Sequence, residues 1–209
     1  MYRISQTEYN ELHSWAKDYI KSKCLIFKDG MPSPVPDYYY SWIFYLRNGL
    51  FNHEFLSAIS QMFIYHAERE IDEHLDFQIT GLETAATPMV AGIPLISRVF
   101  GLDINGFIVR KERKTYGLLN DTEGLILENK PVVMLDDLCN SSESLAKCYN
   151  ILTSKPNLQV LPYAFTIVNK SNKGIHSEER LNTDMYLPHY IKVISPFTLD
   201  DFGLAKPSH

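Results

Sequence analysis

The sequence is poor in cysteine, and its three cysteines, Cys24, Cys139 and Cys148, form no C-x-x-C pair. A zinc site or a disulfide framework is therefore not expected, and the chain suits a reducing compartment. No run of about 18 apolar residues occurs, so a membrane span is not expected. The N-terminus carries no apolar core of signal-peptide length, and we expect a cytoplasmic protein.

Positive charge is not in excess either, because the net charge is −5 and the isoelectric point about 5.8. A generally basic surface for nucleic acid is not indicated. The 209 residues, 45% of them hydrophobic, fit one domain, and no repeat or low-complexity segment stands out. We predict a single domain with an N-terminal helix and hood over residues 1–50, a core over 51–195 and a tail over 196–209.

The pattern along the chain predicts its elements. Apolar residues at helical spacing indicate helices over 6–23, with Ser5 or Thr7 as a cap, and over 52–74. A passage rich in glycine and proline separates them. Beyond residue 75, short apolar runs such as FQIT, GFIV, PVVML and FTIV alternate with helical stretches. This alternation predicts an α/β fold with a mostly parallel sheet flanked by helices. In such sheets ligands bind beyond the carboxyl ends of the strands.

The most informative segment is PVVMLDDLCNSSESLAKC. The run Val132–Leu135 predicts a buried strand, with Asp136 and Asp137 at its carboxyl end and a polar loop, Asn140–Ser144, before a helix. Two carboxylates can accept hydrogen bonds from ribose hydroxyls, and a loop at a helix N-terminus can hold a phosphate. The segment alone is equally typical of a strand that ends in a solvated acidic pair with Ser142 as an ordinary N-cap.

Two motifs together favour the interpretation as a site for a sugar phosphate. VVMLDDLCNSSES resembles the signature of the type I phosphoribosyltransferases, in which a strand, two acidic residues and a loop grip the 5-phosphate of phosphoribosyl pyrophosphate. FIVRKERKTYG resembles the R-K-E-x-K-x-[HY]-G segment of the orotate phosphoribosyltransferases. The resemblance implies that Arg110, Lys111 and Lys114 meet the pyrophosphate, with Lys114 on a loop that enters the neighbouring subunit's site. It thereby implies a homodimer.

Two further segments follow the family's order. FKDGMPSP resembles its L-K-S-G-x-x-S-P turn, which implies that Lys28 contacts substrate and that aromatic residues just beyond, Tyr38, Tyr39 and Tyr40, stack on the base. GLETAATPMVAGI occupies the place of the pyrophosphate loop, where Gly81 and small residues, Thr84 and Ala85 among them, let backbone amides approach an anion.

The sequence departs from the family at two places. The family usually has Gly where Ser142 stands and Gly, Thr or Ser where Glu143 stands, and a carboxylate beside a phosphate is repulsive. The strand after the loop helix usually ends in Asp-Arg, and the arginine recognises orotate. Here Asn169 and Lys170 stand there, and lysine lacks the planar two-pronged donor.

The resemblance implies an enzyme that transfers ribose 5-phosphate from phosphoribosyl pyrophosphate to a nitrogenous base, orotate or another pyrimidine, and releases pyrophosphate. Asp136, Asp137 and Lys114 would be catalytic. Mg²⁺ would be held mainly through the substrate, with no direct protein ligands. The departures at Ser142, Glu143 and Lys170 also leave open a sensor of the same fold that binds nucleotide or phosphoribosyl pyrophosphate without catalysis, or a transferase with another acceptor base.

Overall fold

The computed structural model describes residues 3–32, 39–72, 74–112, 120–170, 187–188 and 190–204. The N-terminal helix α1 spans Gln6–Tyr19 and continues as a π-helical turn over Ile20–Cys24. Ser5 caps it in a capping box, because its side chain accepts the N–H of Glu8 while the Glu8 carboxylate accepts the N–H of Ser5. The predicted helix over 6–23 and its Ser5 cap are confirmed, apart from this change of helical form.

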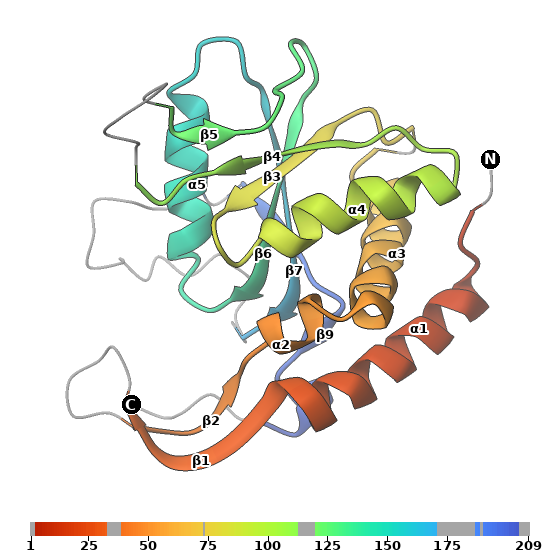
Figure 1. Cartoon of the computed structure of the whole chain (residues 1–209), viewed down its shortest axis with the longest axis vertical. Helices are drawn as coiled ribbons and strands as arrows, with labels where there is room; N and C mark the ends of the chain where they lie inside the picture. The colour runs from red at the N-terminus through yellow and green to blue at the C-terminus, as the bar shows by residue number, and fades with distance from the viewer. Residues whose placement is uncertain are drawn as a thin grey trace.

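A two-stranded hairpin follows α1, in the part of the chain where we predict the hood, and we call it the hood. Its strands β1, Leu25–Pro32, and β2, Tyr39–Phe44, pair in antiparallel fashion. Figure 1 shows the hairpin projecting from the lower end of the molecule, away from the main sheet. The short helix α2, Arg47–Leu50, returns the chain to the body, and α3, His53–Glu70, begins after an Asn52 cap. Helix α3 confirms the helix expected over 52–74, although it is shorter at both ends.

The main sheet is mostly parallel and confirms the predicted α/β class. Its strand order is β5-β4-β3-β6-β7-β8, with β9 paired to β7 beyond the end of β8. Among the described strands of this sheet, only the pair β4–β5 is antiparallel. The strands run over Gln78–Leu82 (β3), Asn105–Val109 (β4), Thr122–Glu123 (β5), Val132–Cys139 (β6), Val160–Asn169 (β7), Lys192–Ile194 (β8) and Phe197–Thr198 (β9).

Helices cover both faces of this sheet (Figure 1). Helix α4, Thr87–Val99, packs with α3 and α1 on one face, and α5, Glu143–Thr153, packs on the other. As a consequence, the side chains of β6 alternate between two hydrophobic cores. Val133 and Leu135 belong to the first core, which contains residues of α1, α3 and α4, while Val132 and Met134 belong to the second, which contains residues of α5. A strand buried on both faces needs a continuous apolar run, which is why VVML carries no polar alternation. No helix in the described part of the chain is long and apolar enough to cross a membrane.

The C-terminal segment differs from the predicted tail. Strand β9 pairs with β7, a 3₁₀ turn follows over Asp200–Phe202, and Phe197, Leu199 and Phe202 are buried in the first core. Their burial beside α1 and the hood gives this segment a structural role. The expectation of a tail is therefore wrong for residues 197–202.

Candidate functional site

Both acidic residues, Asp136 and Asp137, lie within strand β6, near its carboxyl end. The predicted strand Val132–Leu135 extends to Cys139, and Asp136 still pairs with Thr166 of β7. Asp136 is 6% exposed, and its carboxylate accepts the backbone N–H of Asp137 at 2.9 Å. The alternative of a solvated acidic pair therefore does not describe this site.

Burial sets the protonation of this pair. It raises the pKa of Asp136 to about 7, with a further contribution from the Asp137 carboxylate beside it. Burial also raises the pKa of Asp137, while the Arg47 guanidinium opposes that rise. The ammonium of Lys111 acts on Asp136 in the same opposing sense. The pair therefore holds less than its full negative charge near neutral pH, and a cation or a hydroxyl donor bound beside it would favour the ionised form.

The loop after β6 forms a hollow of about 90 Å³. Its walls come from the strand end, the loop and the first turn of α5, namely Asp136, Leu138, Cys139, Asn140, Ser141, Ser142, Glu143, Ser144 and Leu145. The first N–H groups of a helix have no intrahelical partner and favour an anion. The hollow is therefore lined both by the buried Asp136 and by the N-terminus of α5, the two features that a sugar phosphate would require.

Ser142 precedes α5 in the left-handed conformation, with φ 63° and ψ 8°, and its side chain makes no capping hydrogen bond to the helix. Its Oγ lies 3.3 Å from the Cys139 sulfur instead. The interpretation of Ser142 as an ordinary side-chain cap is wrong. The torsion explains why glycine suits this position, since only glycine adopts it without steric strain.

The turn after β3 is the predicted pyrophosphate loop, and Thr84 and Ala85 lie in it, before α4. Gly81 is required by packing, because a Cβ there would lie 2.3 Å from the Ala86 Cβ and 2.4 Å from the Leu135 carbonyl oxygen. The β3 backbone thus approaches β6 closely, just before the acidic pair. The two loops are neighbours because β3 and β6 are paired in parallel.

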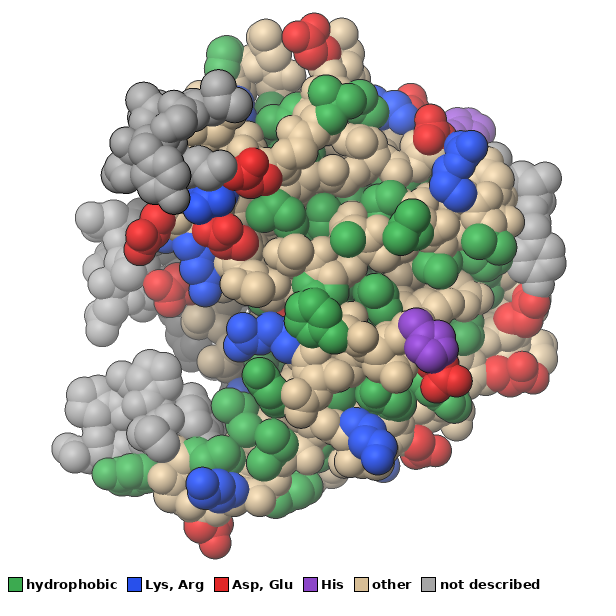
Figure 2. Space-filling model, in the orientation of Figure 1, with side chains coloured by type: hydrophobic (Ala, Val, Ile, Leu, Met, Phe, Trp, Pro, Cys, Tyr) green, Lys and Arg blue, Asp and Glu red, His purple; other side chains and the backbone are tan. Residues whose placement is uncertain are grey.

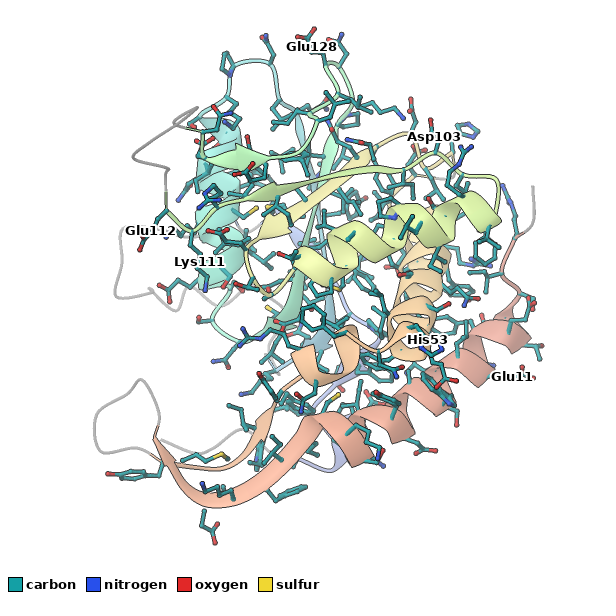
Figure 3. All side chains as sticks on the ribbon, in the orientation of Figure 1. Glu11, His53, Asp103, Lys111, Glu112 and Glu128 are labelled. Carbon is teal, nitrogen blue, oxygen red and sulfur yellow. The ribbon has the colours of Figure 1, made fainter. Side chains whose placement is uncertain are left out.

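Arg110 and Lys111 follow β4, at the same edge of the sheet. Figure 3 shows Lys111 and Glu112 beyond the end of that strand, at the side of the molecule. The Arg110 Nη1 lies 3.1 Å from a carboxylate oxygen of Glu123 and 3.9 Å from one of Glu83. The Lys111 N–H donates to the Glu83 carboxylate at 2.9 Å. The third predicted cation, Lys114, lies outside the described residues.

Lys170 directly follows β7 and lies beside the end of β6. Its N–H donates to the Cys139 carbonyl at 2.8 Å, and its ammonium lies 4.9 Å from the centre of the Trp42 ring of the hood. Lys170 is 7% exposed and Trp42 9%. The structure therefore joins the predicted base-recognition position to the hood through a cation–π contact.

The other hood residues stand apart from this edge. Lys28 on β1 and Tyr39 on β2 are exposed, and the side chain of Tyr40 lies outside what the structure describes. Figure 2 shows hydrophobic and basic side chains on the surface of the hairpin, at the lower edge of this face. Substrate contact by Lys28 and Tyr39 remains a prediction.

Three residues near the site were missed by the sequence analysis. Arg47 opens α2 and acts on Asp137, Glu83 joins the β3 and β4 loops, and Trp42 faces Lys170. The sequence pattern could have indicated that Trp42 is buried, because Trp42 and Phe44 alternate with exposed residues along β2. Arg47 and Glu83 had none, since their partners are distant in the chain.

Comparison with known proteins agrees with this geometry. No protein-family model matches the chain. The orotate phosphoribosyltransferase of Methanosphaera stadtmanae is 28% identical over 134 residues, 64% of this chain and 67% of that protein. The enzyme of the same name from Rhodopirellula baltica is 26% identical over 126 residues, 60% of each chain. The aligned stretch thus spans about two-thirds or less of these relatives.

Solved structures extend the likeness to nearly the whole chain. The Mycobacterium tuberculosis orotate phosphoribosyltransferase in complex with Fe(III) dicitrate superposes with a TM-score of 0.73 at 17% identity, over 92% of this chain and 99% of that one. Its complex with 5-phospho-α-D-ribosyl 1-diphosphate gives 0.62 at 16% identity, over 97% and 98%. The chain therefore has the type I phosphoribosyltransferase fold and is most like the orotate phosphoribosyltransferases.

Proposed function

We propose that the chain is a phosphoribosyltransferase, which transfers ribose 5-phosphate from phosphoribosyl pyrophosphate to a nitrogenous base and releases pyrophosphate. The observation that carries this proposal is the hollow between Asp136 and the start of α5. It pairs a buried acidic end with a helix N-terminus. The naming of the similar proteins as orotate phosphoribosyltransferases supports the same reaction, as does the likeness to a structure that holds the sugar pyrophosphate.

The residues divide into two groups by charge. Asp136 and Asp137 would orient the ribose through its hydroxyls and favour the positive charge that develops on the ring. Arg110, Lys111 and Lys114, with Lys28 from the hood, would stabilise the departing pyrophosphate, on which negative charge builds as the bond breaks. Asn140 to Ser144 would hold the 5-phosphate through backbone N–H groups and hydroxyls.

Magnesium fits this arrangement as a partner of the substrate. No group of three or more His, Cys, Asp or Glu side chains within the described ranges is placed to hold a metal ion. Mg²⁺ keeps several waters and is commonly bound together with substrate phosphates, and we propose that phosphoribosyl pyrophosphate supplies most of its ligands here. When bound, the ion would neutralise charge on the pyrophosphate.

The acceptor base is proposed to lie between the hood and Lys170. Orotate or another pyrimidine would place a carbonyl or carboxylate oxygen toward the ammonium of Lys170, which offers a point charge and no planar fork. Trp42 holds that ammonium from the hood side. A base panel therefore has to include pyrimidines that lack the carboxylate.

A homodimer is proposed as the working form. Leu95 and Val99 lie one turn apart on α4 and are 72% and 79% exposed, which is unusual for two neighbouring apolar side chains of one helix. Within a dimer Lys114 would act in the partner's site. Light scattering during gel filtration measures the assembly state.

The reaction is tested by following pyrophosphate release from phosphoribosyl pyrophosphate with Mg²⁺ and each base in turn. Turnover with at least one base supports the enzyme, whereas saturable binding without any turnover would identify a binding protein of the same fold. The shared site is tested by mixing Lys114→Ala and Asp137→Asn variants. If Lys114 acts across the interface, each mixed dimer regains one intact site and activity returns; a mixture as inactive as its parts refutes that role.

A further inference from the structure

We propose that Glu83 is a positioning residue that holds Lys111 and Arg110 in place for the pyrophosphate group. The proposal deepens the function proposed above and rests on it. Glu83 is the first residue after β3, and its N–H donates to the Val109 carbonyl at 2.8 Å, so it extends the pairing of β3 with β4. Its backbone is therefore fixed relative to the start of the cationic segment.

The Glu83 carboxylate contacts both residues of the cationic segment, Lys111 through its backbone and Arg110 through its guanidinium. Its Oε1 accepts the Lys111 N–H at 2.9 Å, and its Oε2 lies 3.9 Å from the Arg110 Nη1. A hydrogen bond to a carboxylate is shorter and stronger than one between neutral groups. One side chain thus fixes where the chain leaves β4 and, with it, the direction in which the Lys111 side chain departs.

The Lys111 side chain also interacts with the acidic pair. Its ammonium opposes the rise in the pKa of the Asp136 carboxyl. The cationic segment after β4 and the acidic end of β6 flank β3, because β3 pairs in parallel with both strands. Without the Glu83 carboxylate, the Lys111 backbone would be less restrained, and the Lys111 ammonium would occupy a wider range of positions.

Arg110 has a second support among the described residues. Its Nη1 lies 3.1 Å from Glu123 of β5, and its N–H donates to the Asp121 carbonyl at 2.9 Å. Glu123 of β5 contacts Arg110, whereas Glu83 contacts both Arg110 and Lys111, so the carboxylates of Glu83 and Glu123 are not equivalent. The position of Lys111 is expected to depend on Glu83, and that of Arg110 on both.

The test compares Glu83→Ala, which removes charge and acceptor, with Glu83→Gln, which keeps an acceptor for the Lys111 N–H. Calorimetric titration with inorganic pyrophosphate and Mg²⁺ should show affinity about tenfold weaker for Glu83→Ala and near the parent value for Glu83→Gln. In turnover, KM for phosphoribosyl pyrophosphate should rise with kcat changed less. Glu123→Ala should weaken binding less than Glu83→Ala, and Glu128→Ala, a remote exposed carboxylate (Figure 3), should leave it unchanged.

Amide exchange over residues 110–112 provides a readout that needs no substrate. The Lys111 amide should exchange faster in Glu83→Ala and at the parent rate in Glu83→Gln. Parent-like pyrophosphate affinity in Glu83→Ala would overturn the proposal. Equal weakening in both variants would overturn the role of the Lys111 bond, because charge alone would then matter. If the unsubstituted protein binds neither pyrophosphate nor phosphoribosyl pyrophosphate, the proposed function fails, which is a distinguishable result.

Discussion

Replacing Asp136 with Asn should make the protein more stable at neutral pH, although it removes a proposed catalytic group. Asp136 is buried in β6 beside Asp137, and burial raises its pKa from 3.8 to about 7. The carboxylate form is therefore disfavoured in the folded protein and not in the unfolded chain. Asn has nearly the same shape, and its side-chain oxygen can still accept the Asp137 N–H that Asp136 accepts at 2.9 Å.

The sign follows from proton linkage. Between pH 4 and 7 the folded protein binds more protons at this site than the unfolded chain, so the free energy of unfolding falls as pH rises. Below that window both states are protonated and nothing is lost, and above it the loss is constant. Each pH unit between the two pKa values is worth about 1.4 kcal/mol, which gives an upper bound of about 4 kcal/mol. Asp136→Asn removes this loss.

Urea unfolding of both proteins at several values between pH 4 and pH 8 measures the effect. The difference in stability, variant minus parent, should rise across the window by at least about 2 kcal/mol. Any fixed cost of burying the amide cancels in this comparison. Asp103→Asn serves as a control, because its side chain is 90% exposed and its ion pair with Arg98 is at the surface. Parallel pH profiles for parent and Asp136→Asn would refute the burial argument.

Three further substitutions follow from local geometry. Gly81→Ala should destabilise by about 3 kcal/mol or more in urea unfolding, since its Cβ would meet the Ala86 and Leu135 atoms within 2.4 Å; parent-like stability would contradict that contact. Ser142→Gly should stabilise by about 0.5–1 kcal/mol, as relief of the left-handed strain exceeds the entropy of glycine, and a loss would show that the Cys139 contact matters more. Glu143→Gln should tighten binding of inorganic phosphate about fivefold, from about 1 kcal/mol of repulsion; an unchanged dissociation constant in calorimetry would place the carboxylate away from the anion.

Local patterns were sufficient for the elements and the order of the motifs. The run VVML, the acidic pair and the polar loop are contiguous, so their arrangement as strand, site and helix follows from one segment. The length of β6 was not predictable in this way. The apolar run ends at Leu135, with Asp136 and Asp137 at its carboxyl end, yet pairing with β7 extends the strand through both of them to Cys139. Their burial, and hence the raised pKa, depends on neighbours that the segment does not contain.

The C-terminal segment was misjudged for a related reason. Aromatic residues at 197 and 202 resemble a tail when taken alone, but they fill the first core beside Phe44 and His13. On the hood, base stacking by the Tyr38–Tyr40 cluster stays a prediction, while Trp42 of β2 is placed against Lys170. Composition cannot distinguish these cases, because packing partners decide which aromatic side chain is buried.

The sequence by itself determined the α/β class and the position of the acidic pair, since each depends on residues within a few positions of one another, and it narrowed the cap of the first helix to Ser5 or Thr7. Only the tertiary structure decided that Glu83 bonds Lys111, that Arg47 acts on Asp137 and that Trp42 meets Lys170. Each of these contacts joins loops from separate elements. Parallel strands bring their carboxyl ends to one edge of the sheet, and the distances between side chains there are set by strand register and packing, which local patterns do not encode.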